Sequence, residues 1–121
     1  MKILFLDDMK SRFDKFRMAN IGRDIDWAET AEDAIRLLQQ NSYDLISLDH
    51  DLIFAHYNRT TNCAHKDGLC GGVVAQFIAK RPRLFSHAKI HVHTLSYEAG
   101  QSMTSMLKGA YLNAHRRPFS L

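Results

Sequence analysis

The chain has few cysteines, few prolines and no long apolar run among its 121 residues. Its two cysteines are too few for a disulfide scaffold, which favours a reducing, cytoplasmic location. The apolar run at the N-terminus ends at Asp7, too early for a signal peptide or a membrane-spanning helix. Because no repeat or linker interrupts the chain, we expect one domain over residues 1–121 and no membrane partner.

The order of apolar segments indicates alternating strands and helices. Continuous apolar runs are typical of strands that are covered on both faces, and residues 2–6 are the clearest example. Thr30 has an acidic residue, Asp33, three positions later, as a helix N-cap often does. The expected strands are 2–6, 25–28, 43–48, 89–93 and 110–113. The expected helices are 9–19, 31–40, 72–80 and 99–108.

Strands that alternate with helices predict an α/β three-layer sandwich around a five-stranded, parallel, doubly wound sheet. Too few residues follow the fifth strand for another helix, so we expect the last helix to be missing. A long loop, about residues 53–70, is inserted after the third strand. Ligands bind such sheets beyond the carboxyl ends of the strands, and the residues there form the candidate site.

Acidic residues and histidines follow three of the expected strands, so their side chains should converge in one crevice. Converging carboxylates repel each other unless a positive charge lies among them, and a divalent cation is the simplest such charge. Carboxylates favour Mg²⁺ or Mn²⁺, and imidazoles also admit Zn²⁺. The predicted metal ligands are Asp7, Asp8, Asp49, Asp51 and His93. For Asp8 or Asp51 taken singly, a helix cap or turn is the alternative.

Several of these residues belong to motifs with a family resemblance. An acidic pair follows Leu6, Asp49 ends the third strand, Thr94 follows the fourth, and Arg-Pro-Phe follows the fifth at 117–119. This layout resembles a response-regulator receiver domain, in which the acidic pair holds Mg²⁺, the strand-three aspartate accepts a phosphoryl group and the ending contains Lys-Pro-Phe. The resemblance implies a flavodoxin-like receiver fold. Arg117 stands where that family has lysine.

A closer resemblance rests on the string Ser-Leu-Asp-His-Asp-Leu at residues 47–52. The string His-Thr-Leu-Ser follows at 93–96, with Met103 further on. Both strings resemble the cyclic-phosphate-processing receiver domains, in which an asparagine takes the place of Ser96. This resemblance covers about residues 2–110 and implies a metal-dependent phosphoesterase. The implied substrate is a cyclic phosphate, a nucleotide phosphodiester or an RNA-end phosphate.

The catalytic candidates are Asp49, His50, His93, Thr94 and Arg117. His50 or His93 would ligate the metal or act as a general acid and base, and Arg117 with Thr94 would steady phosphoryl oxygens. One alternative is a stand-alone signalling receiver that is phosphorylated on Asp49. Another is a non-catalytic module that binds a nucleotide or a protein. The histidine beside Asp49, the long loop and the missing last helix favour the enzyme over the signalling receiver.

The loop after the third strand also contains a possible zinc site. Two thiols and two imidazoles are the ligand inventory of tetrahedral zinc, and a long hydrophilic loop would benefit from such a staple. The four candidate ligands are His56, Cys63, His65 and Cys70. The alternatives are two thiols with two surface histidines, or a histidine that reaches into the main crevice.

Basic residues outside these motifs are assigned to other positions. The series Lys10, Arg12, Lys15 and Arg17 is typical of the solvated face of the first helix. His91 alternates with His93 on one strand and is expected to be a buried, hydrogen-bonded core histidine. His115 is expected at the surface. The net charge of +3 is compatible with an anionic ligand but also with an ordinary surface.

Overall fold

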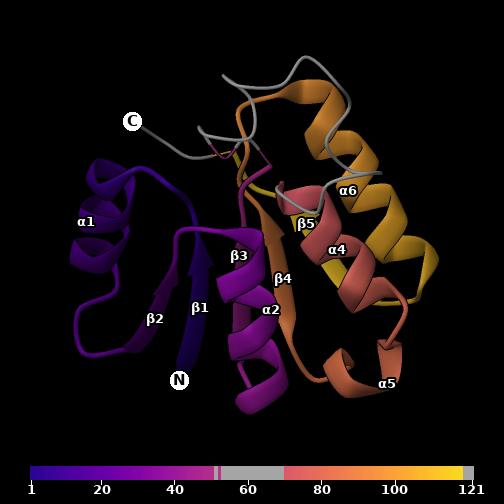
Figure 1. Cartoon of the computed structure of the whole chain (residues 1–121), viewed down its shortest axis with the longest axis horizontal. Coiled ribbons are helices and arrows are strands. Elements are labelled where there is room, and N and C mark those ends of the chain that lie inside the picture. Colours follow the sequence, from indigo (N-terminus) through magenta and orange to yellow (C-terminus); the bar gives the residue numbers. More distant parts are fainter. Residues whose placement is uncertain (51, 53–69, 119–121) are drawn as a thin grey trace.

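The structure, a computed structural model, describes residues 1–50, 52 and 70–118. Its centre is a five-stranded parallel sheet in the order β2-β1-β3-β4-β5 (Figure 1). The strands are β1 (Lys2–Leu6), β2 (Asp24–Ala28), β3 (Leu45–Leu48), β4 (Lys89–Val92) and β5 (Asn113–Arg116). The order reverses between β1 and β3, which is where doubly wound sheets bind ligands. The predicted α/β sheet is confirmed.

Helices cover the two faces of this sheet unequally. The helices in the described residues are α1 (Lys10–Ala19), α2 (Ala31–Gln40), α4 (Gly71–Ala79), α5 (Pro82–Phe85) and α6 (Tyr97–Gly109). Helices α2, α4 and α6 lie side by side over one face, with α4 in contact with both neighbours (Figure 1). No helix follows β5 within the described residues, which end at Pro118. None of the described helices has both the length and the apolar composition that a membrane crossing requires.

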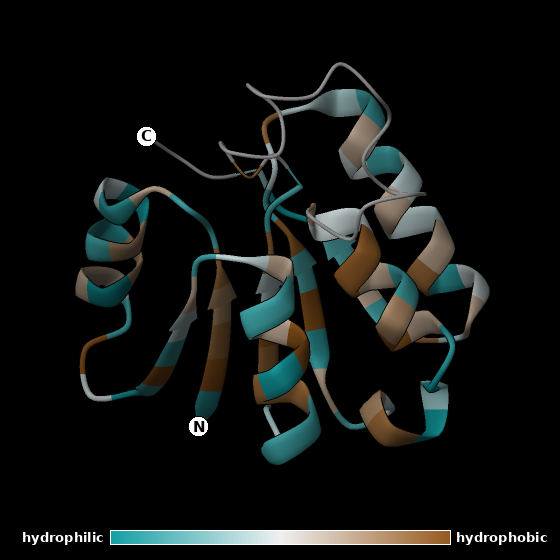
Figure 2. Cartoon of the chain, in the orientation of Figure 1, coloured by the Kyte–Doolittle hydropathy of each residue, from teal (hydrophilic) through white to brown (hydrophobic). Residues whose placement is uncertain are grey.

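The face under α2, α4 and α6 is aliphatic. Strands β1, β3 and β4 each contribute two fully buried side chains, and β1 forms a continuous hydrophobic band in Figure 2. These six residues are Leu4, Leu6, Ile46, Leu48, Ile90 and Val92. Burial of such side chains stabilises a fold by about 1.5–3 kcal/mol each, so this face supplies most of the hydrophobic core.

The face under α1 is aromatic instead. Phe5 stacks on Phe16 with ring centroids 4.3 Å apart, and Phe13 stacks on Trp27 of β2 at 4.5 Å. Helix α1 itself has no fully buried residue. It is therefore attached to β1 and β2 through a small cluster of rings rather than through an extended apolar interface.

Most predicted elements lie within two residues of those observed. Thr30 caps α2 as predicted, because its Oγ1 accepts a hydrogen bond from the amide of Asp33 at 3.1 Å. The short helix α5, which begins at Pro82, was not predicted. Proline at the first helical position starts a helix well, because its missing N–H needs no partner there.

The prediction for the fifth strand was wrong. Residues 110–113 were expected to form it, but β5 runs from Asn113 to Arg116. The amide of Leu112 donates to the carbonyl of Leu107 at 3.2 Å, and Tyr111 adopts a left-handed φ of 64°. This bond closes a Schellman motif, which ends α6 and directs Leu112 into the core before the strand begins.

Candidate metal centre

Three neighbouring strands end on buried polar side chains. Asp7, Asp49 and His93 each follow the last residue of β1, β3 and β4, and all three are at most 3% exposed. The strand pairing continues through them, because the amide of Asp49 donates to the Leu6 carbonyl and that of His93 to the Leu48 carbonyl. One ligand atom from each of the three residues lies within 4.8 Å of the other two. The sequence placed all three at strand ends, and the structure brings them together.

The imidazole of His93 is held on three sides. Its Nε2 lies 3.0 Å from Asp7 Oδ2, and its Nδ1 lies 2.8 Å from Ser47 Oγ. The ring also stacks on Phe5, with centroids 4.8 Å apart and planes within 5°. In the tautomer with a proton on Nε2, this nitrogen donates to the Asp7 carboxylate, and Nδ1 accepts from the Ser47 hydroxyl. Ser47, which was not among the predicted site residues, thus fixes the position of the ring, while its hydroxyl can either donate to Nδ1 or accept from it.

Arg12 supplies positive charge to the same cluster. Its Nη1 lies 3.5 Å from Asp7 Oδ2 and 3.5 Å from Asp49 Oδ2, and its side chain is 16% exposed. The charged residues around Arg12 predicted a place on the solvated face of the first helix, and its contact with the two carboxylates was not predicted. The available signal was its position, because a residue in the first turn after β1 can extend back over the end of that strand.

The cluster holds an excess of negative charge. Burial, followed by the nearby charge of Asp7, raises the pKa of Asp49 from 3.8 to about 6. His93, the amide of His50 and the guanidinium of Arg12 offset only part of this effect. Two buried carboxylates whose charges repel each other are stabilised by an added cation. Two carboxylate ligands with one imidazole therefore fit a divalent ion such as Mg²⁺, Mn²⁺ or Zn²⁺.

The start of α4 fixes the position of the Asp49 backbone. The amide of Gly71 donates to the carbonyl of His50 at 3.0 Å. A Cβ atom on Gly71 would overlap the carbonyl oxygen of Asp49 and come within 3.0 Å of the His50 Cα. Only glycine permits this approach of helix to strand end, so Gly71 determines where Asp49 is held.

The other predicted site residues have different positions. Asp8 is half-buried and is not one of the three clustered ligands. His50 is half-buried, and its amide donates to Asp49 Oδ1 at 2.9 Å. Thr94 is buried, and its Oγ1 accepts from the amide of Ser96 at 3.2 Å. Arg117 is exposed and makes no ion pair with the described acidic residues. Asp51 lies outside the described residues.

The proposed zinc ligands fall mainly in the loop. His56, Cys63 and His65 lie outside the described residues. Cys70 is buried directly before α4 and is disulfide-bonded. A disulfide sulfur is not a thiolate, so zinc ligation and the disulfide are alternative states of Cys70. The loop zinc site stays a prediction.

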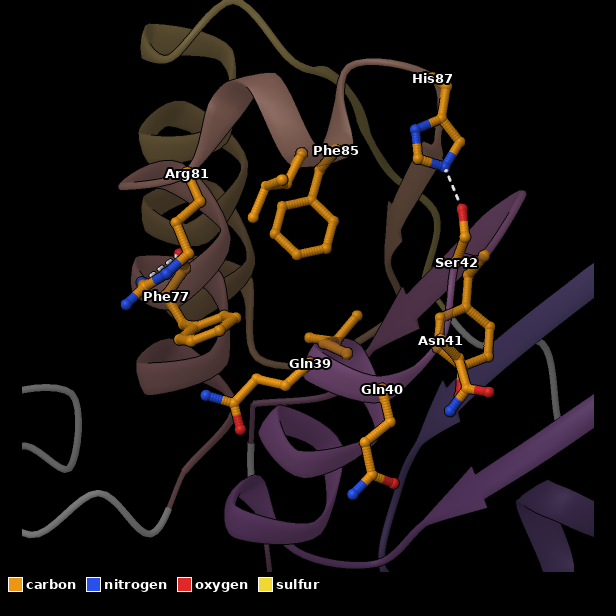
Figure 3. Close-up of a pocket in the computed structure, with 11 residues that line it drawn as sticks. Gln39, Gln40, Asn41, Ser42, Phe77, Arg81, Phe85 and His87 are labelled. Carbon is orange, nitrogen blue, oxygen red and sulfur yellow. Dashed lines mark hydrogen bonds between the residues drawn. The ribbon is translucent and has the colours of Figure 1, made fainter.

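A pocket of about 500 Å³ lies away from this cluster, at the amino ends of the strands (Figure 3). The end of α2 lines it with Gln39 and Gln40, while α4 and α5 contribute Phe77 and Phe85. None of the predicted site residues lines this pocket. The pocket is therefore separate from the chemistry at the carboxyl ends.

Comparison with solved structures defines the class of protein. Response regulator protein TrrA from Thermotoga maritima, solved in complex with Mg²⁺-BeF, has a TM-score of 0.66 and 24% identity, covering 99% of this chain and 87% of that one. The signal receiver domain of a putative LuxO repressor from Vibrio parahaemolyticus has a TM-score of 0.63 and 18% identity, covering 98% and 79%. These matches show that the chain has the receiver fold.

The family is narrower than that fold. Residues 2–109 match the sequence model of the family described as the cyclic-phosphate processing receiver domain. The chain therefore belongs to this family, and the resemblance noted in the sequence is confirmed. A search of curated proteins gave no match.

Proposed function

We propose that this protein is a metal-dependent phosphoesterase that hydrolyses a cyclic phosphate or another phosphodiester of a nucleotide or RNA end. The observation that supports this most strongly is that the side chains of Asp7, Asp49 and His93 are buried together where the strand order of the sheet reverses. Membership of the cyclic-phosphate processing receiver family supports the substrate class. The reaction adds water across one P–O bond and yields a phosphomonoester and an alcohol.

Asp7, Asp49 and His93 would hold the cation. When bound, the cation supplies Lewis-acid polarisation of a phosphoryl oxygen. Arg12 has a separate role, because its guanidinium already lies beside both carboxylates at 3.5 Å and can turn its remaining N–H groups to a phosphate. The fork of the guanidinium then orients the phosphoryl group and offsets its charge.

Ser47 permits two states of His93. In one state the imidazole keeps a proton on Nε2, which it can give to the departing alcohol oxygen. In the other state Nδ1 carries the proton and donates it to Ser47 Oγ, which leaves Nε2 to bind the metal. Both states are compatible with the observed 2.8 Å contact, because a hydroxyl both donates and accepts.

The second candidate function is signalling, with Asp49 as the phosphoryl acceptor. The receiver fold and the position of Asp49 at the end of β3 favour it. Two features favour the enzyme. Asp49 is buried, whereas an aspartate that accepts a phosphoryl group must be reached by the phosphoryl donor. The imidazole of His93 lies beside Asp49, whereas a lasting phosphoaspartate must be protected from attack by water. One set of measurements separates the two functions.

The test begins with purified protein and Mg²⁺, Mn²⁺ or Zn²⁺. Candidate substrates are 2′,3′-cyclic and 3′,5′-cyclic mononucleotides, cyclic oligonucleotides and RNA with a 2′,3′-cyclic end. We expect metal-dependent turnover of at least one of them, with a loss of about 10²-fold or more in Asp49→Asn and His93→Ala. Turnover of none with any of the metals would reject the enzyme. Stable labelling of Asp49 by acetyl phosphate would instead establish the signalling receiver.

Matched control substitutions come from the amino-terminal ends of the strands, opposite the cluster. Asp44 lies at the amino end of β3, where it accepts a hydrogen bond from the Lys2 amide, and His87 is exposed beside Ser42. Asp44→Asn and His87→Ala make the same chemical changes far from the cluster. We expect both controls to keep the activity of the unmodified protein.

A further inference from the structure

The α1 side of the sheet is covered only in part. Helix α1 contacts β1 and β2 through Phe5 and Trp27, and no described helix covers this side of β4 and β5. Side chains alternate between the two faces of a strand, so the residues in phase with His93 share this face. They are Lys89 and His91 on β4, and Asn113, His115 and Arg117 on or directly after β5. All are polar, whereas Ile90, Val92 and Ala114 on the opposite face are buried and apolar, and Arg116 on that face is half-buried with its guanidinium over the Tyr97 ring.

This surface, which we call the basic face, is positively charged, and no acidic side chain of the described residues pairs with its cations. Lys89 and Arg117 are exposed, and neither forms an ion pair with a described residue. Burial, and then the charges of Arg117 and Lys89, lower the pKa of His91. The Nε2 of His91 is buried and makes no hydrogen bond to the described residues, contrary to its prediction as a satisfied core histidine. Asp44, whose carbonyl accepts from the Lys89 amide, has its carboxylate bound to the Lys2 amide at 2.8 Å.

The basic face leads to the metal centre. Lys89, His91 and His93 form one row along β4, with exposure that decreases toward His93. At a rise of about 3.3 Å per residue, this row is about 13 Å long. A stacked nucleic-acid strand places one phosphate about every 3.4 Å, so the row spans several phosphates. The row on β5, which ends in Arg117, lies beside it.

We propose that the basic face binds the phosphodiester backbone of a single-stranded nucleic acid and directs its end to Asp7, Asp49 and His93. The backbone-binding part stands by itself, whereas the placement of the end rests on the proposed function. A protein partner fits less well, because the face lacks the apolar core around which protein interfaces pack. A phosphodiester chain supplies negative charge opposite Lys89 and Arg117, and hydrogen-bond acceptor oxygens for the histidines of this face.

The test measures binding without turnover. A short fluorescein-labelled single-stranded RNA and a DNA of the same sequence are titrated with metal-free protein in EDTA, and fluorescence anisotropy gives the Kd. The variant Lys89→Ser/Arg117→Ser removes two cations from the basic face. The control Lys80→Ser/Arg83→Ser removes two exposed cations near α4 and α5, on the other side of the sheet.

We expect both strands to bind. If Lys89 and Arg117 each neutralise one phosphate, log Kd changes with log salt with a slope of about 1.4, which is about sevenfold between 50 and 200 mM salt. The Lys89→Ser/Arg117→Ser variant should lose the salt dependence that these two cations cause and bind at least about fivefold more weakly, while the Kd of the control variant changes little. RNA that binds more tightly than DNA would identify contacts with the 2′-hydroxyl.

Three results would overturn the inference: no binding at low salt, equal losses in both double variants, or equal competition by polyglutamate. The last would identify an acidic protein as the partner. Hydrolysis of a 2′,3′-cyclic mononucleotide, which is too small to occupy the row, tests the proposed function separately. Mononucleotide turnover without RNA binding rejects the basic face alone, and RNA binding without any turnover rejects the enzyme alone.

Discussion

The two faces of the sheet differ in the side chains that attach helices to them and in the polar groups that they carry. Under α2, α4 and α6 the strands present fully buried aliphatic side chains. On the α1 side, an aromatic cluster holds one helix without a fully buried residue, and the strand ends carry the charged cluster. Buried charges and unpaired polar atoms lower stability, so a protein can keep them only if another region stabilises the fold. The aliphatic face is that region here.

The largest expected effect compares one side chain from each face. Ile90 is fully buried under the helices, and Ile90→Ala should lower the free energy of unfolding by about 2–5 kcal/mol. Phe16 is half-buried in the aromatic cluster, and Phe16→Ala should lower it by about 1–2 kcal/mol despite removing more atoms. Urea unfolding measures both. A larger loss for Phe16→Ala would show that α1 contributes more stability than its exposure indicates.

The next effect concerns the junction between the two faces. Gly71→Ala should force α4 away from the Asp49 carbonyl, at a cost of about 2–4 kcal/mol, and should weaken metal binding. Gly109, near the end of α6, has open space where its Cβ would be, so Gly109→Ala should leave stability unchanged or slightly raised. Thermal unfolding with and without Mn²⁺ measures both quantities. Normal metal binding in Gly71→Ala would contradict the role assigned to this glycine.

The sequence predicted the parts of the site that depend on topology. Asp7, Asp49 and His93 follow three strands, and parallel strands bring their carboxyl ends to one edge whatever the details of packing. Arg12 and Ser47 depend instead on side-chain direction. Arg12 was identified as solvated because its neighbours on α1 are charged, and only the orientation of α1 shows that it reaches both carboxylates.

The positions of most strands could also be predicted from the sequence. Apolar runs located four strands to within two residues, because buried parallel strands are hydrophobic on both faces. The fifth was misplaced because α6 is followed by a turn at Tyr111 that no sequence rule indicates. Aromatic residues seldom adopt a left-handed φ, so the pattern favoured a strand that began too early.

The charged cluster should make the metal-free protein less stable as pH rises. The pKa of Asp49 is about 6 in the folded state against 3.8 in the unfolded state, so the folded state binds more protons between these values. The free energy of unfolding therefore falls as pH rises through this window. Asp49→Asn removes this term and, at pH 7.5 in EDTA, should stabilise the protein by about 1–3 kcal/mol relative to the unmodified chain.

Addition of Mn²⁺ should reverse that ranking. The ion stabilises the protein whose carboxylates bind it, and Asp49→Asn should lose most of this gain. Asp44→Asn, at the other end of β3, should show neither effect. If Asp49→Asn lowered the stability of the metal-free protein at pH 7.5, Arg12 and His93 would be sufficient to neutralise the cluster, and the electrostatic case for a cation would be lost.

The smallest effect lies at the end of α6. Tyr111 is 97% exposed and has a φ of 64°, a conformation that glycine adopts without strain. Tyr111→Gly should therefore raise the free energy of unfolding by about 1 kcal/mol, or the melting temperature by about 4 °C. Ala110→Gly, one position earlier at a φ of −90°, should lower stability by about 0.5–1 kcal/mol, because there glycine adds only unfolded-state entropy. Opposite signs for these neighbouring substitutions would locate the strain at Tyr111, whereas a loss of stability in both would mean that the tyrosine side chain holds the turn.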